Sequence, residues 1–462
     1  MESKLIRPPT DLPTGRSLER LLEALRAPTG DGQGVRVRTQ NLKGSARGYL
    51  LARVARSLEV PLVCVTQDED EAEKLAHDLG FFLGGEGDLL HPNVVHMPGD
   101  EVLPYDELSP DPTLVSGRLG ALFHLNQATR FPALVLSIRA LMKRVLPQSL
   151  MSGLSEHVRV EQDYERDALA RKLVEMGYAS VPLVEDAGTF SIRGDIIDVF
   201  SPLYPRPVRL EFFGDIIESM RAFDPETQRT VDSLKELVLP PTRELLFNSH
   251  TRPNAEAAIR AAAERTNIPT SRVRERLDAI REGMHSVGME AMLPGFFAGG
   301  LSTVFDYLGK WSTRQPLFYL DDPMGIDRAV AHLEAELERE YANVVNLGEL
   351  AEPPALHYLG AGELTGRLRT LRVLEGGGLS LDLGMGDADG KSESVAFGFA
   401  TTKDLRDAIL SHHGEEGALT PLLDRLNRWR DQSIATVVAC GSLGQADRLK
   451  RLLLERNVAV KV

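Results

Sequence analysis

Cysteine is scarce in this chain, whose 462 residues include only Cys64 and Cys440. Each lies in an apolar run, LVCV or VVAC, so both are expected to be buried thiols and not parts of a disulfide framework. Long apolar segments are also absent, because no run approaches the roughly 18 residues of a membrane helix. The N-terminus, MESKLIRPPTDLPTG, lacks the apolar core of a secretion signal. These absences predict a cytoplasmic protein without membrane spans.

Basic residues are fewer than acidic residues. The chain has 53 lysines and arginines against 67 aspartates and glutamates, a net charge of −14. Nucleic-acid binding over the whole surface needs a basic face and is therefore excluded, which leaves room only for a local basic groove. His412 and His413 lie in a polar loop without metal-ligand partners at helical spacing, so no metal site is predicted.

Length and patterning predict several domains. At roughly 100–200 residues per domain, the chain has room for three or four. Residues 34–84 follow the pattern strand, loop, helix, strand, helix, and apolar residues in the second helix recur at helical spacing. Short strands at 94–97 and 133–138 bracket a helix that begins near residue 114. Such repeated βα units predict a parallel sheet covered by helices.

A different pattern in residues 188–230 predicts a small antiparallel meander. Ile, Val and Phe are frequent in 189–200 and 208–213, and the turn formers YPRP separate these two runs. A Gly-Asp pair then joins the second run to a third, 216–223, as a two-residue turn does in a hairpin.

The two faces of the middle strand differ in character. Alternation puts the apolar residues at 208, 210 and 212 on one face, which is expected to be core. The other face carries Arg209, Glu211 and Phe213, together with Arg193 from the preceding run. Residues 155–236 contain 10 basic and 17 acidic residues, a net charge of −7 (10 − 17). A protein partner therefore fits this region better than DNA does.

The amino-acid sequence of this meander resembles that of a known family. GDIIDVFSP, RLEFFGDIIES and AFDPETQRT resemble the second domain of the bacterial transcription-repair coupling factors (Mfd), which is similar to the UvrA-binding domain of the excision-repair protein UvrB. EVLPYDELSPDPTLVSGRLGALFHL and QPLFY also resemble that family. The likeness covers residues 34–343.

The resemblance implies a site and a partner. Arg193, Arg209 and Phe213 align with the positions by which the family contacts UvrA. Asp195 and Glu211 are expected to hold the two guanidinium groups until partner carboxylates replace them. The alternative is that Phe213 is folded under the neighbouring turn and that the arginines form solvated pairs within the domain, which contribute little.

The loop NLKGSARG, residues 41–48, decides between enzyme and non-enzyme. A working phosphate loop needs glycines, a lysine for the terminal phosphates and a hydroxyl for magnesium. Against the UvrB-like pattern, Gly44 and Ser45 match, two other glycine positions hold Asn and Ala, Arg47 replaces the lysine, and Gly48 replaces the hydroxyl. We expect a degenerate phosphate loop without catalytic residues, and neither ATP nor magnesium as a cofactor of this chain.

Residues 101–125 depart from UvrB as well. UvrB carries here a long hairpin that threads DNA strands, whereas this sequence runs through SPDP straight into a helix. Weak DNA binding is therefore expected. Tyr105, beside Pro104, is expected to be a hydrogen-bonded turn aromatic and not a base-stacking residue.

The remaining chain is predicted to return to the first domain and then start another. Residues 237–343 are mostly helical, with 317–320 as a central strand of the first sheet. From 347 the pattern indicates a separate domain that is truncated at its end, with strands at 434–440 and 458–462 around a helix at 443–455.

The predicted fold class is thus α/β: a degenerate P-loop-type parallel sheet with helices, an inserted small α+β meander domain and a further C-terminal α/β domain. The predicted limits are 1–154 for the first part of the P-loop-like domain, 155–240 for the UvrA-binding-like domain, 241–346 for the helical return and 347–462 for the last domain.

Three functions fit to different degrees. The resemblance implies the non-motor part of a transcription-repair coupling factor, which recruits UvrA to RNA polymerase stalled at DNA damage. The polymerase-binding domain and the ATP-driven DNA translocase motor would then lie elsewhere in the parent protein. An ATP-dependent enzyme of the UvrB or helicase kind is the alternative, opposed by the altered loop. A nonspecific DNA clamp is opposed by the net charge.

Overall fold

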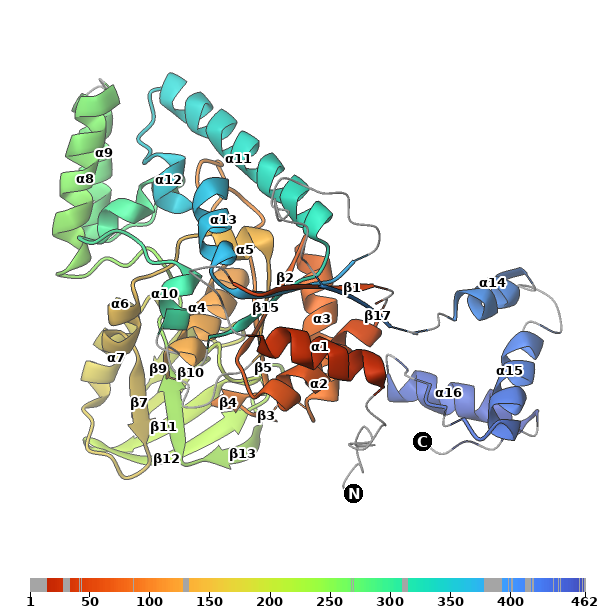
Figure 1. Ribbon diagram of the computed structural model, residues 1–462. Coiled ribbons are helices and arrows are strands. Elements are labelled where there is room, and N and C mark those ends of the chain that lie inside the picture. The colour runs from red at the N-terminus through yellow and green to blue at the C-terminus, as the bar shows by residue number, and fades with distance from the viewer. Residues whose placement is uncertain are drawn as a thin grey trace. The chain divides into compact units, whose positions relative to one another are not determined.

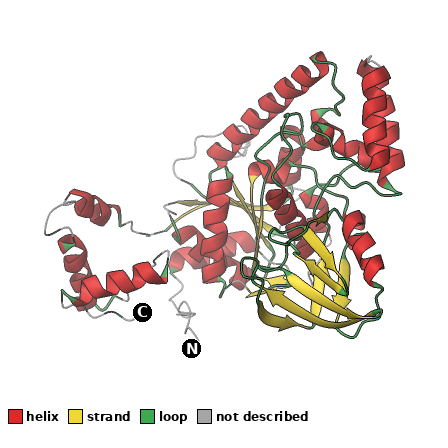
Figure 2. Ribbon diagram, turned by 180° about the vertical axis from the view of Figure 1, so that it is seen from behind, coloured by secondary structure: helices red, strands yellow, loops and turns green. Residues whose placement is uncertain are grey.

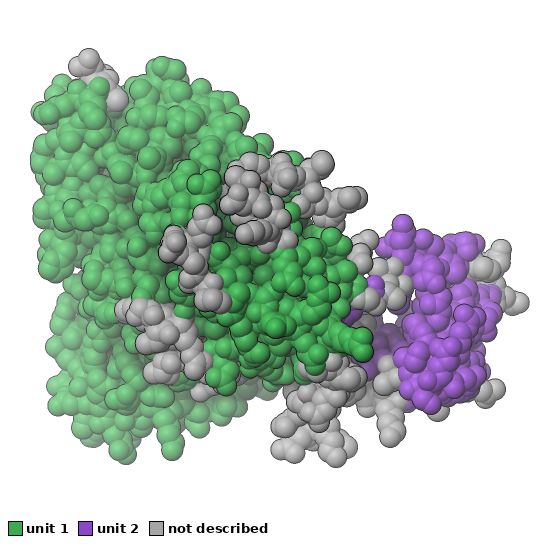
Figure 3. Space-filling model, in the orientation of Figure 1, with its two compact units in different colours: residues 1–397 green, residues 398–462 purple. Residues whose placement is uncertain are grey.

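The computed structural model of the chain describes residues 15–27, 34–40, 42, 44–85, 87–127, 133–266, 268, 270–309, 315–377, 393–397, 399, 402–411, 417, 419–434, 436–438, 440, 442–456, 458 and 460. These form two compact units, Met1–Phe397 and Gly398–Val462, which Figure 3 colours separately.

A parallel sheet is the core of the first unit. In spatial order its strands are β17 (Glu393–Ala396), β1 (Arg36–Gln40), β16 (Arg372–Glu375), β15 (Leu317–Leu320), β2 (Leu62–Thr66), β6 (Ala133–Ser137) and β5 (Val94–Met97). The central strands LFYL, LVCVT and ALVLS are buried at every residue, as strands covered on both faces must be. The predicted α/β class is confirmed, and 317–320 is the central strand.

Helices cover both faces of this sheet. Figure 1 shows α1 (Arg16–Arg26), α2 (Ala46–Leu58) and α3 (Glu69–Phe82) on one side, and α5 (Ile138–Met142), α11 (Pro323–Asn346) and α13 (Ala361–Arg369) on the other. The other helices of this unit are α4 (Pro112–Gln127), α6 (Gln148–Gly153), α7 (Arg166–Glu175), α8 (Thr251–Thr266), α9 (Thr270–Glu282), the 3-10 helix η1 (Met289–Phe296), α10 (Val304–Leu308) and α12 (Pro354–His357). No helix within the described residues is long and apolar enough to cross a bilayer.

The predicted meander is a six-stranded sheet, yellow in Figure 2. Its strands in spatial order are β13 (Thr230–Leu234), β12 (Ile216–Phe223), β11 (Val208–Phe213), β10 (Ile196–Val199), β9 (Thr189–Arg193) and β8 (Ala179–Ser180). One detail differs from the sequence prediction, because the run 189–200 is two strands and not one. Gly194 divides it, and its φ of +59° is a turn conformation that glycine adopts without strain.

The chain enters and leaves this sheet region at one place. β7 (Glu156–Arg159) precedes it and β14 (Glu236–Leu239) follows it, and the two strands pair antiparallel, with Glu156 opposite Leu239. A small hairpin of β3 (Gly87–Asp88) and β4 (His91–Pro92) lies elsewhere in the first unit.

A buried ionic cluster joins the return segment to the first part of the chain. Arg118 on α4 is fully buried and contacts Asp100 at 2.7 Å and Glu244 at 2.9 Å, while Lys143 contacts the same two carboxylates. Burial opposes the charge of Asp100, but Arg118 and Lys143 outweigh it and lower the pKa of Asp100 below its ordinary value. The cluster fixes Glu244, just after β14, against α4.

The expected boundary at residue 347 is wrong. β16 pairs with both β1 and β15, and β17 pairs with β1, so residues 372–375 and 393–396 complete the main sheet. The boundary between the compact units follows Phe397. The physical reason is that a short apolar strand between helices can join either an existing sheet or a new one, and periodicity alone does not distinguish them.

The second unit is helical in the residues that the structure describes. It contains α14 (Lys403–Ser411), α15 (Thr420–Asp431) and α16 (Leu443–Leu454). α16 matches the helix predicted at 443–455, and the Ser442 side chain accepts a hydrogen bond from the Gln445 backbone N–H at 3.3 Å. The described residues of 434–440 and 458–462 form no strand, contrary to expectation. SLDLGM, His412 and His413 lie outside the described residues.

The two cysteines differ from each other. Cys64 is fully buried in β2, as predicted, whereas Cys440 is only half-buried. Both are free thiols.

Candidate partner interface and the altered phosphate loop

One face of the six-stranded sheet carries the predicted site residues. In the strand register Asp198 of β10 lies opposite Arg209 of β11, and Arg193 of β9 lies opposite Ile196. Side chains two residues apart on a strand, and those directly opposite on its neighbours, share one face. The alternation therefore brings Arg193, Asp198 and Arg209 together.

Asp198 holds both arginines. Arg209 donates through Nε to Oδ1 of Asp198 at 2.7 Å and through Nη2 to Oδ2 at 2.9 Å. Arg193 donates through Nη2 to the same Oδ2. The hydrogen bond to Asp198 raises the pKa of Arg209 above its ordinary value against the opposing effect of burial. The guanidinium carbon of Arg209 also lies 4.8 Å from the ring centre of the buried Phe223, a cation–π contact.

The two carboxylates that were expected to hold the arginines contact other residues instead. The Asp195 side chain is 84% exposed and approaches Arg166 at 3.9 Å. Glu211 accepts hydrogen bonds from Ser219 at 2.7 Å and from Arg221 at 3.3 Å. The expectation was wrong because Asp195 meets β11 only through its backbone carbonyl, which accepts a hydrogen bond from Phe212 at 2.8 Å, whereas Asp198 lies directly opposite Arg209.

Phe213 is exposed. It ends β11 with 76% of its surface accessible, and Ile216, its partner across the Gly214 turn, is 47% exposed. The alternative in which Phe213 is folded under the turn is therefore wrong. An exposed aromatic side chain on the same sheet face as two partly exposed arginines forms a surface suited to a protein partner.

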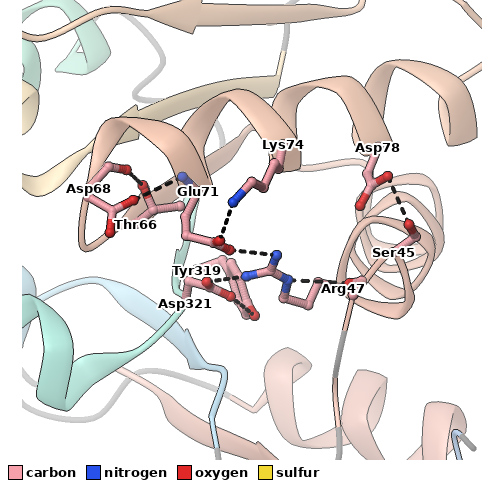
Figure 4. A network of polar contacts seen from close by, with 10 residues as sticks. Ser45, Arg47, Thr66, Asp68, Glu71, Lys74, Asp78, Tyr319 and Asp321 are labelled. Carbon is pink, nitrogen blue, oxygen red and sulfur yellow. Dashed lines mark hydrogen bonds and ion pairs between the residues drawn. The ribbon is translucent and has the colours of Figure 1, made fainter. Parts of the chain in front are cut away.

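In the altered phosphate loop, Arg47 is paired with acidic residues of the same chain. Figure 4 shows Arg47 between Glu71 and Asp321, at the carboxyl ends of β2 and β15. Arg47 donates to Oε2 of Glu71 at 2.9 Å and also to Asp321, which accepts a further hydrogen bond from the Tyr319 hydroxyl at 2.8 Å. Burial raises the pKa of Asp321 against the opposing effect of Arg47. The carboxyl end of a parallel sheet, where ligands usually bind, is here occupied by internal ion pairs.

The neighbouring loop residues also have structural partners. Ser45 donates to Oδ1 of Asp78 at 2.9 Å. A Cβ added at Gly48 would lie 2.7 Å from Cβ of Asp78, so glycine permits the close packing of α2 on α3 at the position where a hydroxyl would be needed. Gly44 has a φ of +56°. Asn41 and Lys43 lie outside the described residues.

Tyr105 is confirmed as a turn aromatic. It is 6% exposed, and its hydroxyl donates to the backbone carbonyl of Glu352 at 2.8 Å. Its ring packs against Tyr341 and His357. Among the described residues, no group of three or more His, Cys, Asp or Glu side chains is arranged to hold a metal ion.

Comparisons with known proteins agree with this geometry. Residues 157–245 match the family model described as the UvrB interaction domain. A transcription-repair-coupling factor of Myxococcus xanthus is 59% identical over 448 residues, which cover 97% of this chain and 36% of the relative. Those of Mycobacterium bovis and Escherichia coli are 35% identical over 274 residues and 30% identical over 269 residues, and the chain covers 21% and 22% of their lengths.

Over 97% of its length, this chain is similar to a transcription-repair-coupling factor. The resemblance stated from the sequence is therefore confirmed. The chain spans about a third of the length of its Myxococcus relative, 36%. The match to the UvrB interaction domain contains the whole six-stranded sheet and with it Arg193, Arg209 and Phe213.

Sequence reasoning missed three partners of these arginines. Asp198 could have been found from strand alternation once 189–200 was divided at Gly194, because an even spacing then puts it opposite Arg209. Asp321 follows directly on the buried strand LFYL, and an acidic residue at the end of a central strand is a recognisable pattern. No comparable sequence pattern identifies Glu71 on α3 as a partner of Arg47.

Proposed function

We propose that this chain is the non-motor part of a transcription-repair coupling factor and that it recruits the excision-repair protein UvrA to RNA polymerase stalled at DNA damage in the cytoplasm. UvrA is bound at Arg193, Arg209 and Phe213. RNA polymerase and DNA are engaged, and ATP is hydrolysed, by parts of the longer coupling factors that this chain does not share.

The observation that carries the proposal is the exposed Phe213 on the same sheet face as Arg193 and Arg209. Phe213, with 76% of its surface exposed, pairs across the turn with the exposed Ile216, and adjoining apolar side chains rimmed by polar residues are typical of interaction sites. Aromatic and arginine side chains are the residues that most often dominate binding energy at protein interfaces. The fit to the UvrB interaction domain supports the same conclusion.

The chemistry of this face specifies what the UvrA surface must offer. The arginines require carboxylates, because a guanidinium group pairs best with a planar anion through two hydrogen bonds. Phe213 and Ile216 require an apolar recess beside those carboxylates. DNA does not meet both requirements, and residues 155–236 carry a net charge of −7 (10 − 17).

We propose further that this chain does not hydrolyse ATP. Arg47 is engaged by Glu71 and Asp321, so it is not available to the terminal phosphates of a nucleotide. Gly48 offers no hydroxyl to magnesium. The alternative, an ATP-dependent enzyme of the UvrB or helicase kind, lacks support in this loop.

The proposal is tested by titrating purified chain with UvrA in a calorimeter or by surface binding. The unaltered chain should bind, and Phe213→Ala should weaken binding by about 2 kcal/mol or roughly 30-fold. Val231→Ala is the matched control, because Val231 is an exposed apolar residue of the same sheet, 49% accessible, on the edge strand β13.

Equal losses for both variants would indicate a general effect on the sheet. No binding by the unaltered chain, or binding unaffected by Phe213→Ala, would place the partner contact elsewhere.

A further inference from the structure

Asp198 lies at the centre of the arginine pair but is closed to solvent. Only 1% of its side chain is exposed, whereas 48% of Arg193 and 21% of Arg209 are exposed. A partner could therefore reach the arginines but not the carboxylate between them. Its two oxygens accept three described hydrogen bonds, two from Arg209 and one from Arg193.

The described hydrogen bonds use only part of each guanidinium group. Arg209 contacts Asp198 through Nε and Nη2, and Arg193 through Nη2. Within the described part of the chain, Nη1 of Arg209 and both Nε and Nη1 of Arg193 make no hydrogen bond. Each arginine is thus fixed on one side and keeps further N–H groups for a second anion.

We infer that Asp198 is a positioning residue for partner binding: it holds Arg193 and Arg209 in the orientation in which their remaining N–H groups meet the carboxylates of the partner. This inference rests on the proposed binding of UvrA at the same face. Its physical basis is preorganisation, because a long side chain that is already ordered loses less conformational freedom when the partner arrives.

The sign of the change in binding affinity distinguishes positioning by Asp198 from a simple charge effect. Asp198 is an anion next to the arginines, so it opposes the attraction of an acidic partner through space. If charge alone mattered, Asp198→Asn would make the face more positive and tighten binding. If positioning dominates, the same substitution weakens binding although the partner never touches residue 198.

The binding experiment compares Asp198→Asn with Asp232→Asn, which removes an exposed charge from β13 of the same sheet. We expect Asp198→Asn to weaken UvrA binding by tenfold or more and Asp232→Asn to change it less than twofold. Unchanged or tighter binding by Asp198→Asn would overturn the inference. If the unaltered chain does not bind UvrA, the proposed function fails as well.

A double-mutant cycle excludes an effect through folding. In a chain that already carries Arg193→Ala and Arg209→Ala, Asp198→Asn should cause no further loss of affinity. A loss of the same size in that background would mean that Asp198 acts through the fold of the sheet, and the inference would be wrong.

A measurement without the partner tests the geometry directly. In chain labelled with ¹⁵N-arginine, the Nε–H proton of Arg209 should exchange slowly with water because it is bonded to Asp198, and the exchange should become at least tenfold faster in Asp198→Asn. Asp198→Glu keeps the charge and should restore part of the protection. Exchange at the same rate in all three proteins would show that Asp198 does not order the arginine.

Discussion

Arg47 and Arg193 are both held by carboxylates, yet one belongs to a closed network and the other to an open one. The Arg47 side chain is 14% exposed and contacts two acidic residues, Glu71 and Asp321. The Arg193 side chain is 48% exposed, and among the described residues the acidic group that it contacts is Asp198, which Arg209 shares. The difference teaches that an arginine becomes available to a partner when its carboxylate is buried beneath it and its other N–H groups face no neighbour.

The same difference applies to the apolar surroundings. Near Arg47, Tyr319 is fully buried and its hydroxyl is bonded to Asp321. In the six-stranded sheet Arg209 also contacts a buried aromatic ring, that of Phe223, but Phe213 and Ile216 at the end of β11 and the start of β12 are exposed. The main-sheet site has used its charge and its aromatic residue for internal contacts, whereas the six-stranded sheet keeps Phe213 and part of Arg193 at the surface. The predictions below test this contrast.

The largest expected effect is on stability at the closed network. Arg47→Ala leaves Asp321 buried without its ion partner, and breaking a buried pair in this way costs about 3 kcal/mol of unfolding free energy. Urea denaturation measures the loss. UvrA affinity should not change, and Arg20→Ala, whose side chain is 65% exposed, should have little effect on stability. A weakened UvrA affinity in Arg47→Ala would contradict the assignment of stability to one region and of binding to the other.

The next effect is on binding at the open pair. Arg209→Ala should reduce UvrA affinity by about 2 kcal/mol, roughly 30-fold. Arg209→Lys should fail to restore it, because an ammonium group cannot contact Asp198 through two nitrogens and still offer a third. The loss of stability should be smaller than for Arg47→Ala, since Arg193 still reaches Asp198. Full binding by the lysine variant would show that the forked geometry of the guanidinium group is not required.

Acid should weaken the closed main-sheet region. His357 is 4% exposed, and burial lowers its pKa to about 3, against about 6.5 in the unfolded chain. The unfolded state therefore binds more protons below pH 6.5, and stability that is complete above pH 7 is lost as the pH falls toward 3. Between pH 8 and pH 5 the unfolding free energy should fall by about 2 kcal/mol for this residue alone.

The histidine prediction is checked by urea denaturation at both pH values. His357→Gln should reduce the difference between them, whereas His332→Gln, with a side chain 78% exposed, should not. An identical pH dependence in His357→Gln and the parent would show that another group is responsible.

The smallest expected effect is the response to nucleotide. Titration with magnesium-ATP should give no affinity tighter than millimolar, because Arg47 is already paired and Gly48 offers no magnesium ligand. Micromolar binding that Arg47→Ala abolished would mean that the internal network opens for phosphate.

Sequence reasoning anticipated the features that periodicity and turn chemistry determine. Val208, Leu210 and Phe212 are buried and Phe213 is exposed, as alternation requires. The strand at 317–320 is buried on both faces, as its continuous apolar run of four residues indicates.

The features that it missed depend on contacts distant in sequence. Asp321 meets Arg47 across 274 positions, and Glu375 meets Arg38 across 337, which no local pattern encodes. β16 and β17 were assigned to a new domain because their own residues do not reveal that β1, more than 330 residues earlier in the chain, is their neighbour. Asp198 was missed only because one turn at Gly194 was not recognised.

The pairing of β7 with β14 has a mechanical consequence. Both connections between the six-stranded sheet and the rest of its unit run through these two adjacent strands, Glu156–Arg159 and Glu236–Leu239. A force that drew the six-stranded sheet away from the rest of its unit would load both strands in the same direction, so the hydrogen bonds between them would not be sheared. The base of the sheet is therefore arranged to resist such a force without separation of its two strands.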